Sequence, residues 1–223
     1  MEEIKREKAK ILEAVRSRRL NPPPPSLPEL PEDSTNLIKS SLSSPPSTTL
    51  IERFCIPITP RDLRTLMGAS WLNDEIINFY FEMISERSAG TVHVMNTFFY
   101  TKLKDSGYAS VRRWTKKVDI FARNRVLLPV HLGVHWCMAE IDMPGKRILY
   151  YDSLHGSNEL CLQLLLDWLK SEHSDKKLTP LPDAEDWQLL IPHSSTPTQQ
   201  NGYDCGVFTC VAAEYRSRNA GLF

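Results

Sequence analysis

The chain has 223 residues, of which 41% are hydrophobic, and its 27 Lys and Arg balance its 27 Asp and Glu. This balance argues against nucleic acid as the main ligand, because a phosphate backbone requires a basic excess. Five cysteines, an odd number without a Cys-x-x-Cys pair, argue against a disulfide framework and favour a reducing intracellular setting. The charged N-terminus lacks the apolar stretch of a secretory signal, and no run approaches the ~18 apolar residues of a membrane span.

Two N-terminal segments are expected to lie outside the folded domain. Residues 1–20 are rich in Lys, Arg and Glu and predict a short charged helix, marginal on its own. Its RSRR cluster fits either a nuclear-import patch or a solvated charged face. Residues 21–50 contain NPPPPSLPELP and SLSSPPSTT, a composition that predicts a disordered linker. The folded domain is therefore expected to cover residues 51–223.

Two helices are expected soon after this linker. Thr59 followed by Pro60 predicts an N-cap with proline at the first helical position. Asn73 predicts the cap of a second helix with an acidic first turn, near the positive end of the helix dipole. Apolar residues between 76 and 84 then recur at spacings of three and four, which indicates a buried helix face.

Three strands are expected in the middle of the chain, at 125–132, 135–142 and 147–154, and the last two flank the turn sequence MPGK. An amphipathic helix (NELCLQLLLDWLK), a short strand (within DWQLLIPHS) and a last apolar helix over 205–215 follow. One side of that last helix is expected to be apolar and to consist of Val207, Phe208, Val211 and Tyr215. Helices before and after a strand cluster predict an α+β fold.

The segment QQNGYDCGVF raises the question of whether Cys205 is a nucleophile. Cys205 lies where a loop ends and a helix is expected to begin, and a helix N-terminus lowers the pKa of a thiol. Gly202 and Gly206 permit a tight turn and close approach of a substrate. A cysteine at the start of an apolar helix is also common as a small buried residue. The residues alone leave both interpretations open.

A nucleophilic cysteine needs a base, and the hairpin register selects one of the six histidines. If MPGK forms a four-residue loop, Asp142 pairs with Arg147, and His135 and Asp152 become diagonal neighbours on one face. The Cβ atoms of such neighbours lie roughly 7–8 Å apart, which allows an Asp–His hydrogen bond between the side chains. That bond would fix the tautomer of the imidazole. A slip of one residue would place the two side chains on opposite faces.

Few other residues have a chemical role in this interpretation. Gln199, six residues before Cys205, can stabilise an oxyanion together with a backbone N–H group. His131 and His135 are four residues apart, but on a strand this spacing makes no metal-binding face, so no metal and no cofactor are expected. The remaining cysteines are interpreted as structural: Cys55, Cys137, Cys161 and Cys210.

Six motifs follow one another in the order WLNDEIINFY, NTFFYTKL, RRWTKKVD, HLGVHWCMAEID, YYDSL and QQNGYDCGVFTC. Together, over roughly residues 51–215, they resemble the sentrin/SUMO-specific cysteine proteases of the Ulp family. The resemblance implies a papain-like α+β fold, with a small mixed or antiparallel sheet flanked by helices and the nucleophile at a helix N-terminus. It implies a nuclear thiol protease that cleaves after the C-terminal Gly-Gly of a SUMO-type modifier, in precursors and in conjugates. We expect a monomer.

The resemblance also assigns roles to individual residues. The matches to the catalytic group are His135 as base, Asp152 as its orienter, Cys205 as nucleophile and Gln199 as oxyanion donor. The matches to modifier contacts are Trp71, Trp136, Asp74, Arg113 and His131. The two tryptophans match indoles that roof a narrow tunnel, which admits a diglycine because glycine has no side chain. Without the resemblance, Trp71 reads equally well as a core residue and Arg113 as a solvated surface arginine.

Two alternatives to the SUMO protease stay open at this stage. The substrate could be a different ubiquitin-like modifier. Family domains also continue for several dozen residues past the nucleophile, so the sequence predicts that a C-terminal segment is missing here. In that case the chain would be a destabilised or non-catalytic modifier-binding protein.

Overall fold

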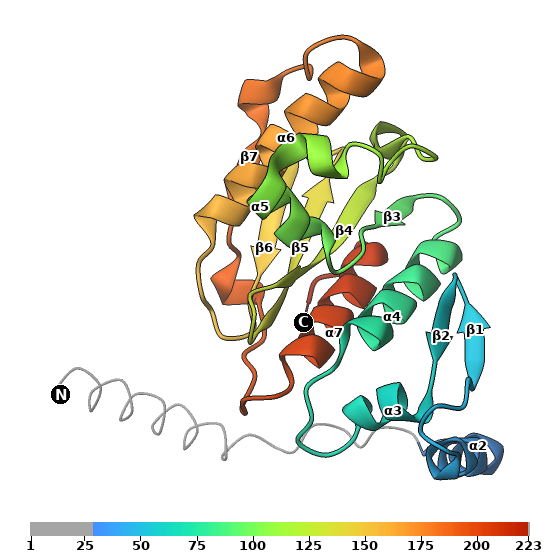
Figure 1. Ribbon diagram of the computed structural model, residues 1–223. Helices are drawn as coiled ribbons and strands as arrows, with labels where there is room; N and C mark the ends of the chain where they lie inside the picture. The colour runs from blue at the N-terminus through green and yellow to red at the C-terminus, as the bar shows by residue number, and fades with distance from the viewer. Residues whose placement is uncertain (1–28, 223) are drawn as a thin grey trace, which may run out of the picture. The chain divides into compact units, whose positions relative to one another are not determined.

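The structure is a computed structural model that describes residues 29–222 (Figure 1). The charged helix predicted for residues 1–20 lies outside the described residues. The chain divides into two units, residues 1–40 and 41–223. Among residues 29–222, none of the helices combines the length and the hydrophobicity that a membrane span requires.

Helix α2 (Glu32–Ser43) corrects the prediction that the whole of 21–50 is a disordered linker. The prolines of that segment flank the helix, and none lies within its twelve residues. Glu32 and Asp33 stand in the first turn, where the helix dipole favours negative charge. The average composition of the segment therefore concealed a proline-free stretch that can form a helix.

A five-stranded mixed sheet forms the centre of unit 41–223 (Figure 1). Its strands in spatial order are β3 (Val92–Val94), β4 (Arg125–His131), β5 (Trp136–Asp142), β6 (Arg147–Tyr151) and β7 (Gln188–Leu190). The three central strands are antiparallel, whereas β3 and β7 run parallel to their neighbours β4 and β6. The predicted strands are confirmed, with the third ending three residues earlier than expected.

The predicted hairpin register is confirmed. Asp142 pairs with Arg147, and Met138 pairs with Tyr151 at the other end of the ladder. The MPGK loop closes with Lys146 in a left-handed conformation, at a φ of 46°. The next residues beyond the ladder are Cys137 on one strand and Asp152 on the other.

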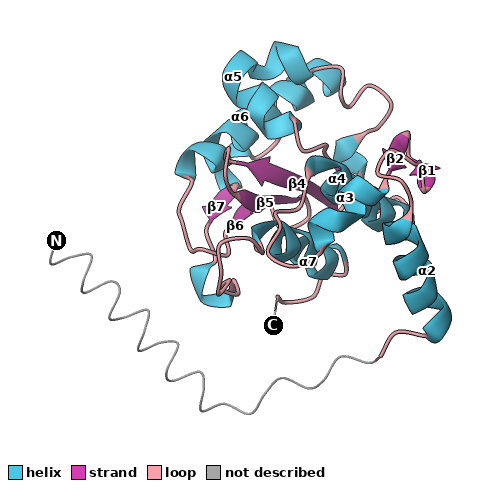
Figure 2. Ribbon diagram, turned by 60° about the horizontal axis from the view of Figure 1, so that its bottom comes forward, coloured by secondary structure: helices cyan, strands magenta, loops and turns pink. Residues whose placement is uncertain are grey.

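Helices pack on both faces of this sheet, and two core clusters result (Figure 2). Helices α5 (Phe99–Val111) and α6 (Glu159–Lys177) cover one face, while α4 (Asp74–Arg87) and α7 (Cys205–Ser217) cover the other. Because strand residues alternate, Cys137 joins the first cluster, and Trp136 and Met138 join the second. This arrangement confirms the α+β fold class.

Smaller elements complete the described chain. A hairpin of β1 (Ile51–Arg53) and β2 (Ile56–Ile58), which the sequence did not predict, precedes α3 (Pro60–Leu63). Thr59 and Asn73 cap α3 and α4 as predicted, and the Asn73 side chain accepts a hydrogen bond from the Ile76 N–H. Short 3-10 turns lie at Arg64–Leu66, Ile120–Ala122, Ala184–Asp186 and His193–Ser195.

Helix α7 contacts the sheet through its small residues. On the apolar side named from the sequence, Val207 and Tyr215 remain 41% and 37% exposed. The buried residues are Cys205, Gly206, Thr209, Cys210, Ala212 and Ala213. Small side chains allow the helix to approach the sheet closely, which a pattern of large apolar residues does not reveal.

Candidate active site

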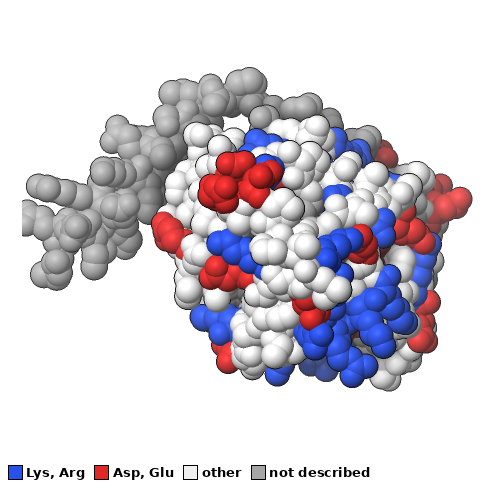
Figure 3. Space-filling view, turned by 90° about the horizontal axis from the view of Figure 1, so that it is seen from above, with Lys and Arg blue, Asp and Glu red and all other residues white. Residues whose placement is uncertain are grey.

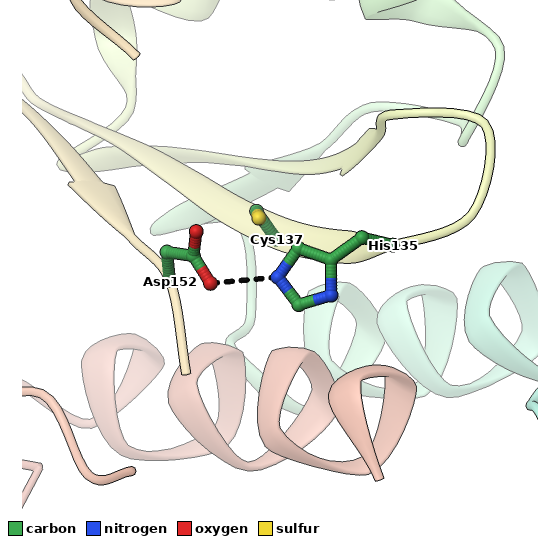
Figure 4. Close-up of side chains that lie close together, drawn as sticks. All are labelled: His135, Cys137 and Asp152. Atoms are coloured by element: carbon green, nitrogen blue, oxygen red, sulfur yellow. Dashed lines mark hydrogen bonds and ion pairs between the residues drawn. The ribbon is translucent and has the colours of Figure 1, made fainter. Parts of the chain in front are cut away.

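His135 and Asp152 meet beyond the end of the β5–β6 ladder (Figure 4). His135 directly precedes β5, and Asp152 directly follows β6. His135 Nε2 lies 2.6 Å from Asp152 Oδ1, a hydrogen bond that the predicted register anticipated. Both side chains are largely buried, with 14% and 7% of their surfaces exposed.

The carboxylate of Asp152 is held in place by the backbone that follows it. The Leu154 N–H donates to Oδ1 at 2.8 Å, and the Gly156 N–H donates to Oδ2 at 3.1 Å. Burial raises the pKa of Asp152, but the hydrogen bonds from His135 and these N–H groups outweigh it, so the pKa is lowered. Asp152 is therefore ionised and accepts the hydrogen bond from His135.

The environment of His135 favours the imidazolium ion. The hydrogen bond to Asp152 is the largest cause that raises the pKa of His135, and hydrogen bonds to the Cys137 and Cys205 thiols raise it further. Burial acts in the opposite direction but is outweighed. Because Asp152 occupies Nε2, the other ring nitrogen, Nδ1, is left to face a nucleophile.

Cys205 is the first residue of α7 and is 2% exposed. Burial raises the pKa of its thiol, but the hydrogen bond to His135 and the backbone N–H groups of Trp136 and Gly206 outweigh burial, so the pKa is lowered. A raised imidazole pKa beside a lowered thiol pKa favours a thiolate–imidazolium pair. The arrangement can attack a carbonyl carbon.

Gln199 lies in the loop before α7 and is buried. Its Oε1 accepts a hydrogen bond from the Ser153 hydroxyl at 2.6 Å, and its Nε2 donates to the Asn201 carbonyl at 2.7 Å. Because the Asn201 carbonyl only accepts, these contacts fix which end of the amide carries the N–H groups. The amide nitrogen carries two N–H groups, and only one of them is used by the Asn201 carbonyl. The other can donate to an oxyanion and stabilise it.

Four residues named from the sequence line one pocket: Trp71, Asp74, His131 and Trp136. The Trp71 Nε1–H donates to the Gly202 carbonyl at 2.9 Å, which joins the segment before α4 to the loop before Cys205. The Trp136 indole stacks on His131 with ring centroids 4.2 Å apart. The pocket therefore adjoins the Cys205 loop and has aromatic walls.

Arg113 is the one named substrate residue that the structure does not bring to this pocket. It is exposed in the turn after α5 and is absent from the pocket lining. Phe98 and Thr97, which the sequence interpretation did not single out, do line the pocket, and the aromatic run NTFFY was the available signal. Figure 3 also shows Lys and Arg gathered on part of one face, so the zero net charge is not evenly spread.

Cys137 is a second thiol at this site that sequence reasoning interpreted as structural. Single ligand atoms of His135, Cys137 and Asp152 lie within 4.8 Å of one another (Figure 4). The confirmed register already contained the signal, because Cys137 shares a face with His135 and stands opposite Asp152. These three residues form a candidate set of metal ligands.

A family model described as "Ulp1 protease family, C-terminal catalytic domain" matches residues 70–221. A "Sentrin-specific protease" of Caenorhabditis elegans is 47% identical over 195 residues, which cover 85% of this chain and 28% of that protein. "Sentrin-specific protease 2" of Rattus norvegicus is 40% identical over 196 residues, which cover 86% of this chain and 33% of that protein. The chain thus spans about a third of the length of these curated relatives.

A solved structure of similar fold is the C-terminal Ulp1 protease domain in complex with Smt3, the yeast ortholog of SUMO. The two chains share 38% identity and a TM-score of 0.77, and the match covers 88% of this chain and 89% of that one. A structure of the SUMO protease Ulp1 with its catalytic cysteine oxidised to a sulfenic acid matches with a TM-score of 0.77 and 37% identity.

Proposed function

This chain belongs to the Ulp1 protease family, and on that basis we propose that it is a cysteine protease that cleaves after the C-terminal Gly-Gly of a SUMO-type modifier. The observation that carries the proposal is the hydrogen bond between Asp152 and His135, with the Cys205 thiol beside the same imidazole: the pKa of the imidazole is raised and that of the thiol is lowered. The substrates are precursors of the modifier and its conjugates to lysine.

The reaction follows from the positions of these groups. The Cys205 thiolate attacks the carbonyl carbon of the terminal glycine, and the electron pair of the C=O bond moves to oxygen. The Gln199 Nε2–H and a backbone N–H group stabilise that oxyanion. As the tetrahedral intermediate collapses, the C–N bond breaks and the His135 Nδ1–H protonates the departing amine. His135 then takes a proton from water, whose oxygen attacks the thioester carbonyl carbon. The C–S bond breaks, and the thiolate–imidazolium pair is restored.

The pocket beside Cys205 accounts for the proposed preference for glycine. Trp71 and Trp136 are held by hydrogen bonds to the carbonyls of Gly202 and Leu72, at 2.9 and 3.0 Å. Because both indoles are held in this way, the slot between the Trp71 and Trp136 side chains cannot easily widen. A chain without side chains can pass it, and holding that chain in the slot places its carbonyl next to the thiolate.

Incubation of the full chain with SUMO carrying a C-terminal vinyl sulfone, followed by intact mass spectrometry, tests the proposal. We expect a single adduct that disappears in Cys205→Ala, because only the activated thiolate adds to the electrophile. A folded protein that binds SUMO but forms no adduct would instead be a non-catalytic binder.

A panel of the same electrophile on other ubiquitin-like modifiers tests the choice of modifier. We expect the fastest adduct formation with SUMO. Faster reaction with another modifier would keep the protease assignment and overturn the SUMO assignment.

A further inference from the structure

A thiol that the proposed reaction does not use lies beside the His135–Asp152 pair. Cys137 stands on β5, is 1% exposed and forms no disulfide. The His135 ring and the Tyr150 side chain are both close enough to influence its thiol. A buried cysteine that serves only as a small apolar residue needs no such polar neighbours.

The three side chains offer the donor set of a zinc site. An imidazole nitrogen, a thiolate sulfur and a carboxylate oxygen are the ligands that Zn²⁺ takes in proteins, and three protein ligands with one open position are common. Here one such atom from each of His135, Cys137 and Asp152 lies within 4.8 Å of the other two. Figure 4 shows the three side chains converging from β5 and from the end of β6.

The distances are close to those that zinc requires. With metal–ligand distances of 2.0–2.3 Å, the donor atoms of a tetrahedral site lie roughly 3.4–3.8 Å apart. His135 Nε2 and Asp152 Oδ1 are now 2.6 Å apart because a proton lies between them. Tetrahedral spacing requires these two atoms to separate by about 1 Å. It also requires the Cys137 sulfur, which now lies at most 4.8 Å from them, to stand within about 3.8 Å of both. Small side-chain rotations supply such movements.

We propose that His135, Cys137 and Asp152 form an inhibitory Zn²⁺ site in which the ion replaces the proton between the imidazole and the carboxylate. Binding releases the Nε2 proton and the Cys137 thiol proton to solvent. The metal-bound ring keeps its Nδ1 proton, since losing it would leave an imidazolate anion. The ring therefore no longer protonates a departing amine. The inhibitory effect rests on the proposed protease function, whereas metal binding itself does not.

Metal binding is tested first, without any need for activity. Co²⁺, which takes the same ligands as Zn²⁺, is titrated into full-length Cys205→Ala, so that the nucleophile cannot supply the sulfur. We expect a thiolate-to-Co²⁺ charge-transfer band with tetrahedral ligand-field bands, and displacement of Co²⁺ by Zn²⁺ in equal amount.

Adding Cys137→Ser to this background should remove the charge-transfer band and weaken Zn²⁺ binding by at least about tenfold, since loss of even an outer-shell partner costs that much. Cys161→Ser is the matched control, because Cys161 is a buried thiol of α6 in the same core cluster as Cys137, and its replacement should leave the spectrum unchanged. An unchanged spectrum in Cys137→Ser, or no charge-transfer band in Cys205→Ala, would overturn the proposal.

Inhibition is then tested on the chain with Cys205 present, by cleavage of a SUMO precursor in buffered Zn²⁺. Each variant is compared with its own zinc-free rate. We expect reversible inhibition that a chelator relieves, and at least about a tenfold higher half-inhibitory Zn²⁺ concentration in Cys137→Ser. Equal zinc sensitivity in Cys137→Ser would overturn the inhibitory site. If no SUMO is cleaved but Co²⁺ binding depends on Cys137, the metal site stands and the proposed protease function fails.

Discussion

Asp152 controls the charge state of the proposed catalytic pair. Its hydrogen bond is the largest cause of the raised pKa of His135, and its own pKa is lowered by that bond and by backbone N–H groups. Below the pKa of Cys205 the thiolate is lost, and above the pKa of His135 the imidazolium is lost. A lowered thiol pKa and a raised imidazole pKa therefore widen the pH range in which the ion pair exists.

Replacement of Asp152 by Asn should narrow that range from the alkaline side. An amide carries no charge to stabilise the imidazolium, so the pKa of His135 falls and the alkaline limb of the pH–rate profile moves to lower pH. Turnover should drop by roughly 10²–10⁴-fold, the contribution of a positioned acid–base group. The measurement is the pH dependence of SUMO-precursor cleavage.

Asp142→Asn is a suitable control for this profile. Asp142 is also a buried carboxylate with a lowered pKa, but it pairs with Arg147 at the other end of the same hairpin. Its replacement should leave the alkaline limb in place. If the alkaline limb of the pH–rate profile did not move in Asp152→Asn, a group other than Asp152 would be responsible for the raised pKa of His135.

Among the elements, the start of α7 depends on one glycine. A Cβ built on Gly206 would stand 2.7 Å from the Leu72 Cβ, closer than carbon atoms approach without displacement. Leu72 is itself buried and accepts the Trp136 indole hydrogen bond on its carbonyl. The first turn of α7 is therefore packed against the segment that carries one wall of the pocket.

Gly206→Ala should push this first turn away from Leu72. We expect a loss of about 1–3 kcal/mol in the free energy of unfolding, as for other overpacked sites. Alkylation of Cys205 should slow as well, because its sulfur moves from His135. Urea denaturation and the rate of reaction with iodoacetamide measure the two effects.

Gly202→Ala tests whether overpacking is the cause. A Cβ on Gly202 meets no atom within 4 Å, and Gly202 is not among the glycines with positive φ. We therefore expect a nearly unchanged free energy of unfolding in this variant. Equal losses in both glycine variants would point to backbone flexibility in the loop as the cause.

Across the whole molecule, a buried ion network holds the last helix to the sheet. Glu140 on β5 is fully buried, and its carboxylate lies 2.7 Å from both Arg125 Nε and Arg216 Nε. The Tyr151 hydroxyl donates to the same carboxylate at 2.9 Å. Because α7 begins with Cys205 and the strand follows His135, this network fixes the two halves of the proposed active site to each other.

Arg216→Met should cost about 3–5 kcal/mol in the free energy of unfolding, since it leaves part of the buried charge of Glu140 uncompensated. Adding Glu140→Gln should cost less than the sum of the single changes, because the two residues belong to one network. Chemical denaturation of the single and double variants measures this coupling.

Arg218→Met provides the control, because Arg218 lies near the same end of α7 but is 62% exposed in its pairing with Glu214. Its loss should have little effect on stability. Strict additivity of Arg216→Met and Glu140→Gln would show that the network contributes nothing as a unit.

Much of this architecture was predictable because it depends on local patterns. The caps at Thr59 and Asn73, the three central strands and the hairpin register follow from residues close in sequence. That register brought His135 and Asp152 together before any tertiary information was used. The fold class followed from the order of the elements.

The features that sequence reasoning missed depend on tertiary packing, or were hidden because the composition of a segment was judged as a whole. The buried side of α7 is set by how closely the helix approaches the sheet, and not by its largest apolar residues. Helix α2 was concealed by the prolines around it. Cys137 was set aside because a single buried cysteine is commonly structural, although its place opposite Asp152 was implied by the register.

The position of Trp71 also provides a natural optical reporter. Trp71 is 51% exposed and lines the pocket, whereas Trp136 in the same pocket is 7% exposed and Trp114, at 39%, is absent from the pocket lining. A peptide tail that entered the pocket would cover the Trp71 ring and remove water from it. We therefore expect a blue shift of the intrinsic fluorescence when Cys205→Ala binds a modifier ending in Gly-Gly, and no shift with Trp71→Phe. Occupancy of the slot can then be followed in real time without a label and without turnover.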